Sequence, residues 1–179
     1  MSSTLLLSLV ALAAPPGVGD AAADFTLATV DGESTSLAEL NEFGPVVLVV
    51  LRGFPNYQCP LCSRQVGDFM AKADEFATLD AELAFVYPAD EQLGREGTRK
   101  KAQEFLENAR LPDNVTVLLD PGYSLTERYG LRWAAPNETA YPSTFVIDRG
   151  GIVRSATISK THGGRTAAAA VLEEVKALD

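Results

Sequence analysis

The sequence predicts an α/β fold in which a central mixed β-sheet carries helices on both faces. Pro45–Leu51 contains an unbroken run of valine and leucine, which is typical of a strand buried on both faces. A helical pattern follows this strand, and strand and helix patterns continue to alternate after it. The chain has 179 residues, 46% of them hydrophobic and 22% charged, which suits one domain with a substantial core.

Runs of apolar or alternating residues between turn signals set the expected strands. The first two flank the turn Asp31-Gly32, and the last two flank Asp148–Gly151 as an antiparallel hairpin. Three apolar runs lie between these pairs and supply the middle of the sheet. The expected strands are Asp24–Ala28, Ser34–Ser36, Pro45–Leu51, Leu83–Tyr87, Val115–Leu119, Thr144–Ile147 and Ile152–Ile158.

Apolar residues at helical spacing set the expected helices. The most important of them follows the central strand and has one apolar face for the sheet. Its apolar positions are Cys62, Val66, Phe69, Met70, Ala73 and Phe76. The other expected helices are a short turn at Leu37–Leu40, a charged helix at Gly97–Ala109 and a closing helix at Arg165–Leu178.

Residues 1–17 are expected to be a tail or the remnant of an export signal, and residues 18–179 the folded domain. The apolar run Leu5–Ala14 is too short to span a bilayer. The residues before it lack the basic side chain that a secretory signal normally carries. Cytoplasmic and exported locations therefore both stay open, and no membrane span is expected.

The charge balance argues against a nucleic-acid partner. The formal net charge is −9, and the basic residues are scattered apart from Arg99-Lys100-Lys101, which acidic residues flank. Binding to phosphates needs clustered Lys and Arg, so this short run is expected on a solvated helix face.

The only two cysteines form one Cys-x-x-Cys, Cys59 to Cys62, between the buried strand and the helix. Free amide groups and the positive end of the dipole at a helix start stabilise a thiolate there. Pro60 suits the first helical position, because its missing N–H needs no partner. A structural zinc site needs about four ligands, and the single His162 is far away in sequence. We therefore expect redox chemistry, with no metal and no cofactor.

Two less reactive interpretations of the pair stay open. Cysteine is often buried as a small hydrophobic residue, so both thiols could be inert. The pair could also form a structural disulfide, although one that closes so short a loop is readily opened. The placement between strand and helix, with no other cysteine in the chain, favours the redox interpretation.

At these residues the chain resembles the thioredoxin superfamily, and within it the peroxiredoxin-like branch with alkyl hydroperoxide reductase and thiol-specific antioxidant proteins. The similarity covers about Gly17 to Leu178 and implies a thioredoxin-like fold. Three segments carry it besides the cysteine motif. They are the opening segment Val18–Leu27, the turn Asp31-Gly32 and the later strand Tyr141–Asp148.

The resemblance also implies roles for individual residues. Peroxiredoxins carry a Pro, three residues, a Thr, two residues and then the Cys that attacks peroxide. Pro55 and Cys62 occupy the first and last of these positions, and Cys59 stands in place of the Thr. By resemblance, Cys62 would attack the peroxide and Cys59 would resolve its sulfenic acid into a disulfide.

A departure from the family pattern puts the substrate-orienting cation in doubt. Peroxiredoxins have an Arg just before the later strand, where this chain has Pro142. A proline there resembles the cis proline of thioredoxin, so we expect a cis bond; a strand-edge proline is the alternative. Arg52, at the end of the central strand, is the first candidate for the missing cation, or else a solvent-exposed loop charge. Arg165, which resembles a second family Arg, is the second candidate, and His162 is either a proton shuttle or a plain loop residue.

Three functions fit these residues. The first is reduction of hydroperoxides through a Cys59/Cys62 dithiol–disulfide cycle, with an external thiol reductant that is thioredoxin-like or glutathione. The second is thioredoxin-like exchange with protein disulfides, in which Cys59 attacks. The third is a redox-inert or Cu(I)-binding module, which lacks the support of a methionine cluster. Peroxide reduction is the function that we expect.

Overall fold

The run of valines and leucines forms the central strand of the sheet. The computed structural model describes residues 14–178, and in it all five residues of β3 (Val46–Val50) are buried. β3 pairs in parallel with β4 (Glu82–Ala89) and antiparallel with β6 (Ser143–Ile147). Neighbouring strands close both edges of β3, and its side chains point to the two faces of the sheet, where each set is buried in a hydrophobic cluster.

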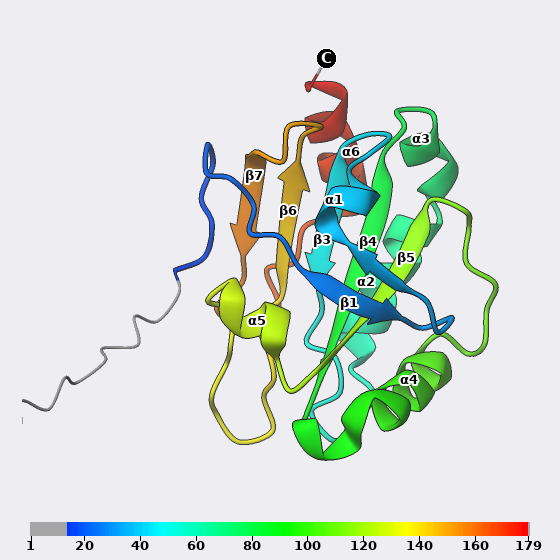
Figure 1. Ribbon diagram of the computed structural model, residues 1–179, viewed down its shortest axis with the longest axis vertical. Coiled ribbons are helices and arrows are strands. Elements are labelled where there is room, and N and C mark those ends of the chain that lie inside the picture. Colours follow the sequence, from blue (N-terminus) through cyan, green and yellow to red (C-terminus); the bar gives the residue numbers. More distant parts are fainter. Residues whose placement is uncertain (1–13, 179) are drawn as a thin grey trace, which may run out of the picture.

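The described strands form one mixed sheet in the order β2-β1-β5-β4-β3-β6-β7 (Figure 1). β3, β4 and β5 run parallel, and every other neighbouring pair is antiparallel. The other strands are β1 (Thr26–Thr29), β2 (Ser34–Ser36), β5 (Val115–Pro121) and β7 (Val153–Ile158). The helices are α1 (Leu37–Leu40), α2 (Pro60–Met70), α3 (Ala73–Ala77), the 3₁₀ turn η1 (Glu91–Leu93), α4 (Gly94–Phe105), α5 (Ser124–Arg128) and α6 (Ala168–Lys176).

Helices cover both faces of this sheet, as predicted. Val47 and Val49 of β3 point to the face on which α2, α3, α4 and α6 pack. Val46, Leu48 and Val50 point to the opposite face, which α1 and α5 cover. In Figure 1 the sheet accordingly lies between these two groups of helices. The α/β fold with a central mixed sheet and helices on both faces is confirmed.

Three of the expected helices have boundaries that differ from the sequence-based expectation. The expected helix through Cys62 and Phe76 is two helices, because the backbone turns at Lys72 between α2 and α3. The closing helix begins at Ala168 and not at Arg165, since Ala167 is extended and caps it. The third difference is α4, which ends at Phe105, four residues before the expected end.

The short helix α5 was not expected. It begins beside Asp120, a fully buried residue at the end of β5. The carboxylate of Asp120 accepts hydrogen bonds from the backbone amides of Leu125 and Thr126 at 3.0 and 2.9 Å. It also accepts from the hydroxyl of Thr126 at 2.7 Å. An acidic side chain that satisfies the free amides of a first turn stabilises a helix that is short.

Residues 1–13 lie outside the described part of the chain, so the expected tail or export signal is not addressed by the structure. Between residues 14 and 178, no helix has both the length and the apolar character needed to cross a membrane.

Replacing Phe69 with alanine is expected to lower the free energy of unfolding by about 3–5 kcal/mol. Phe69 is fully buried in α2, and its ring lies 5.9 Å from that of Phe76 and 6.0 Å from that of Phe85. Urea denaturation measures the change. The matched control is Phe43→Ala, because the Phe43 side chain is 73% exposed and its removal should cost less than about 0.5 kcal/mol. Equal losses in the two variants would contradict this account of the core.

Candidate active site

The cysteine pair lies at the start of α2, just beyond the end of β3. Cys59 is the N-cap residue of α2, and Pro60 is its first residue, as predicted. The amide of Cys62 donates to the carbonyl oxygen of Cys59 at 3.0 Å, which places both side chains on the first turn. Both cysteines are free thiols, and their exposed fractions are only 3% for Cys59 and 0% for Cys62.

The surroundings divide the two thiols into a thiolate and a proton donor. The Cys62 thiol donates a hydrogen bond to Cys59, and this is the largest cause that lowers the pKa of Cys59 to about 5. Burial opposes this change, while the amides of Cys62 and Leu61 and the charge of Arg165 support it. The same hydrogen bond, together with burial, raises the pKa of Cys62 well above its ordinary value. In this arrangement Cys59 is the more acidic thiol of the pair, and Cys62 is its hydrogen-bond donor.

Arg165 is the cation that lies against the thiols. Its Nη2 is 3.5 Å from Sγ of Cys62 and 3.9 Å from Sγ of Cys59. Its Nη1 donates to Oε1 of Gln65 at 2.8 Å, and its Nε donates to the carbonyl oxygen of His162 at 3.1 Å. These hydrogen bonds fix the orientation of the guanidinium, so that its Nη2 lies against the two sulfurs.

Arg52, the first candidate for this cation, faces a different group. Its buried guanidinium pairs with the carboxylate of Glu138, with Nη2 2.9 Å from Oε1. It also donates to the Tyr57 hydroxyl and to the carbonyl oxygen of Asn137. Its contribution to the thiols comes from its backbone amide, which lowers the pKa of Cys62. The side chain is thus neither a solvent-exposed charge nor a partner of the thiolate.

Glu138 connects Arg52 to the loop that carries Arg165. Its Oε1 is 2.7 Å from Nε2 of His162, whose ring lies 5.1 Å from the ring of Trp133. Burial raises the pKa of Glu138, but the hydrogen bonds from Arg52 and His162 outweigh it and hold that pKa below its usual value. The side chain of His162 therefore fixes this loop to Glu138, and its backbone carbonyl oxygen accepts the hydrogen bond from Nε of Arg165. No motif in the sequence marks Glu138, and only its position in the fold shows its role.

Pro142 is a trans proline, which corrects the expectation of a cis bond. No peptide bond in residues 14–178 is cis. Pro142 precedes the first residue of β6, and its carbonyl oxygen accepts from the amide of Ser159 at 2.9 Å. A proline at a strand start keeps its acceptor and loses only an amide that the ladder does not need there. It is therefore the strand-edge proline of the alternative interpretation.

Pro55 is buried in the loop between β3 and α2. It lines a cavity of about 190 Å³ together with Tyr123, Arg132 and Glu138. The structure thus places it beside the Arg52–Glu138 pair, in the loop that delivers Cys59 to the helix start.

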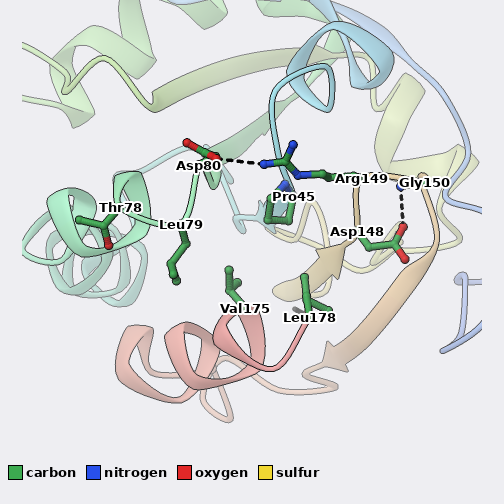
Figure 2. A pocket seen from close by; sticks show the side chains of 9 residues that line it. All are labelled: Pro45, Thr78, Leu79, Asp80, Asp148, Arg149, Gly150, Val175 and Leu178. Atoms are coloured by element: carbon green, nitrogen blue, oxygen red, sulfur yellow. Dashed lines mark hydrogen bonds and ion pairs between the residues drawn. The ribbon is translucent and has the colours of Figure 1, made fainter.

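A separate cavity of about 340 Å³ lies at the other end of the sheet, where Pro45 precedes β3 (Figure 2). Arg149 and Asp80 form an ion pair of 3.0 Å across its mouth, and Val175 and Leu178 of the C-terminal region line its floor. The cysteines follow the opposite end of β3, so this cavity is no part of the dithiol site.

The thiolate absorbance of the reduced protein is expected to titrate near pH 5. Because the pKa of Cys59 is lowered, alkylation of this thiol should be fast above that pH and slow below it. Arg165→Gln removes a nearby positive charge and should move the midpoint upward by about one pH unit. The control is Lys160→Gln, which changes an exposed cation of the same loop that packs on the ring of Tyr141. An unchanged midpoint in Arg165→Gln, or an equal shift in the control, would contradict this role for Arg165.

The chain is similar to a known protein family in sequence and to solved structures in fold. The model of the AhpC/TSA family matches residues 18–156. Peroxidoxin BcpB from Mycobacterium tuberculosis is similar in structure, with 23% sequence identity, a TM-score of 0.67 and coverage of 92% of this chain and 99% of that chain. A peroxiredoxin-like protein from Aquifex aeolicus has 19% identity, a TM-score of 0.71 and coverage of 94% and 91%.

AhpC from Mycobacterium tuberculosis has 17% identity, a TM-score of 0.69 and coverage of 92% and 93%. No curated protein matches the chain in sequence. These structural likenesses confirm the thioredoxin-like fold. The family match extends over most of the chain, and the matched residues include Cys59 and Cys62. The chain therefore belongs to the AhpC/TSA family and is a thiol-dependent peroxidase.

Proposed function

We propose that the protein reduces small hydroperoxides in a dithiol–disulfide cycle in which Cys59 attacks and Cys62 resolves. The arrangement that supports this order is the position of Cys59 at the start of α2, where the buried Cys62 thiol donates to it, lowers its pKa and keeps its own pKa raised. The resemblance to peroxiredoxins implied the opposite order, with Cys62 attacking. The position of Cys62 in the family motif supports attack by Cys62, whereas burial and hydrogen bonding support attack by Cys59.

The cycle balances with the groups that are present. The Cys59 thiolate attacks one oxygen of the peroxide, the O–O bond breaks, and an alcohol or water leaves after it takes a proton. Cys59 is then a sulfenic acid. The Cys62 sulfur attacks that sulfur and loses its proton, so a disulfide forms and water leaves. Two equivalents of an external thiol then restore the dithiol and become a disulfide themselves.

Arg165 is placed to assist the first step. Its guanidinium donates toward both sulfurs, so an oxygen that approaches Cys59 enters the same field. The negative charge moves from sulfur to the departing oxygen during attack, and a fixed cation beside that path stabilises it. Both thiols are nearly covered, so the substrate that reaches Cys59 without movement of its surroundings is small.

Single-turnover experiments on serine variants test the order of attack. Cys62→Ser should consume one equivalent of hydrogen peroxide at close to the normal rate and stall as a sulfenic acid, which a dimedone probe traps. Cys59→Ser retains only the Cys62 thiol, whose pKa burial still raises, and it should react at least about tenfold more slowly, because one pKa unit changes the thiolate fraction about tenfold. Fast consumption of one equivalent of peroxide by Cys59→Ser, together with slow consumption by Cys62→Ser, would restore the order implied by the resemblance.

Exchange with protein disulfides is the second candidate, since a Cys59 nucleophile with a buried Cys62 resolver fits that reaction too. The trans bond at Pro142 removes one of the features that suggested it. Incubating Cys62→Ser with a disulfide-containing protein would trap a mixed disulfide if this activity is present. A trapped adduct that forms faster than peroxide is consumed would make disulfide exchange the main activity.

A further inference from the structure

A groove lies directly beside the dithiol, and Arg165 is the residue of its lining that the proposed peroxide reaction uses. One wall is the exposed face of α2, and the other is the loop before α6. The groove has a volume of about 360 Å³, within the size range of small-molecule sites. It is lined by Leu61, Arg64, Gln65, Asp68 and residues 162–167. Leu61 lies inside the cysteine motif and Arg165 touches both sulfurs, so the groove adjoins the reacting atoms.

Two arginines line this groove on a protein whose net charge is −9. Arg64 is exposed on its rim, and Arg165 is half-buried in its wall. The lining also contains the carboxylate of Asp68. Its Oδ2 accepts a hydrogen bond from the amide of Ala168 at 2.7 Å, so part of its negative charge is compensated at the start of α6. His162 also lines the groove, but its Nε2 is turned to Glu138. A local cationic site on an acidic protein favours an anionic ligand.

The charge of this groove depends on the redox state of the dithiol. In the reduced protein the Cys59 thiolate lies against Arg165 and compensates its charge. In the disulfide form neither sulfur carries a charge, so Arg165 presents an uncompensated cation to the groove. The disulfide form is the one that the external reductant binds and reduces.

We propose that the groove binds an anionic low-molecular-weight thiol as the reductant, and that it binds this thiol in preference when Cys59 and Cys62 are joined. This inference rests on the proposed dithiol cycle and names its electron donor by chemical class. The carboxylates of the thiol pair with Arg64 and Arg165, and its sulfur lies toward Leu61 and the disulfide. When the Cys59 thiolate is restored it competes for Arg165, and the spent ligand is released.

The reduction step balances within this arrangement. The ligand thiolate attacks Sγ of Cys59, the Cys59–Cys62 bond breaks, and the Cys62 sulfur leaves and takes up a proton. A second thiol attacks the mixed disulfide, which releases the ligand disulfide and the Cys59 thiolate. Two ligand thiols are oxidised for each protein disulfide that is reduced.

Binding of an unreactive analogue tests the proposal without peroxide. S-methylglutathione has the carboxylates of glutathione but no thiol, and Trp133, the single tryptophan, contacts the groove residue His162. Its fluorescence should report binding to the disulfide form about tenfold tighter than to the reduced form at neutral pH, as expected for one compensating charge near a partly exposed cation. The same molecule with both carboxylates converted to amides should bind weakly to both forms.

Three variants separate charge from other causes. Reduced Cys59→Ser lacks the thiolate but has no disulfide, so it should bind the analogue like the oxidised protein. Arg64→Gln should weaken binding severalfold in the disulfide form. Arg149→Gln is the matched control, because Arg149 lines the cavity of similar size at the other end of the sheet and should have no effect (Figure 2).

Equal affinity in the two redox states, or equal affinity for the charged and amidated analogues, would overturn the proposal. So would an Arg64→Gln variant that binds normally. None of these results depends on peroxide turnover, so a failure here is distinguishable from a failure of the dithiol cycle, which the serine variants test.

Discussion

A negative charge on a nearly covered sulfur is the constraint on which the rest of this site depends. A buried anion is costly unless hydrogen bonds and cations compensate it. Cys59 is 3% exposed, and its thiolate is compensated by the Cys62 thiol, by amides at the start of α2 and by Arg165. These partners come from two distant parts of the chain. The fold therefore has to bring the loop before α6 to the start of α2, and it has to keep it there.

Polar contacts hold that loop at several points. The amide of Ser159 binds the carbonyl oxygen of Pro142, the ring of His162 binds Glu138, and the amide of Ala168 binds Asp68 of α2. Glu138 is in turn fixed by Arg52 at the end of β3. The side chain of Arg52 is thus connected to the loop of Arg165 through Glu138 and His162. Arg52 was the first candidate for contact with the thiolate. It instead holds Glu138, and Glu138 holds the loop that carries Arg165.

The parts of the structure that local patterns encode were predicted well. The valine-rich run predicted β3, and the strand–CxxC–helix order predicted Cys59 at the start of α2, because each depends on neighbouring residues only. The helix α5 was missed, since its first turn depends on the buried carboxylate of Asp120. The break between α2 and α3 was missed because both helices present apolar residues to the same core and so continue one pattern.

The choice between Arg52 and Arg165 depended on contacts that sequence proximity does not show. Arg52 is close to the cysteines in sequence yet turns to Glu138, while Arg165 is separated from Cys62 by 103 positions and touches it. Two departures from the family pattern now explain each other. In the proposed cycle, Cys59 in place of a Thr introduces a thiolate beside Cys62, and Pro142 stands just before β6 where the family pattern has an Arg. A cation on the loop meets that thiolate from the groove side, so the charge that the groove presents changes whenever the thiolate is lost to a disulfide. A site with its cation on the sheet and a neutral Thr at this position would have no such coupling between redox state and the charge of the groove.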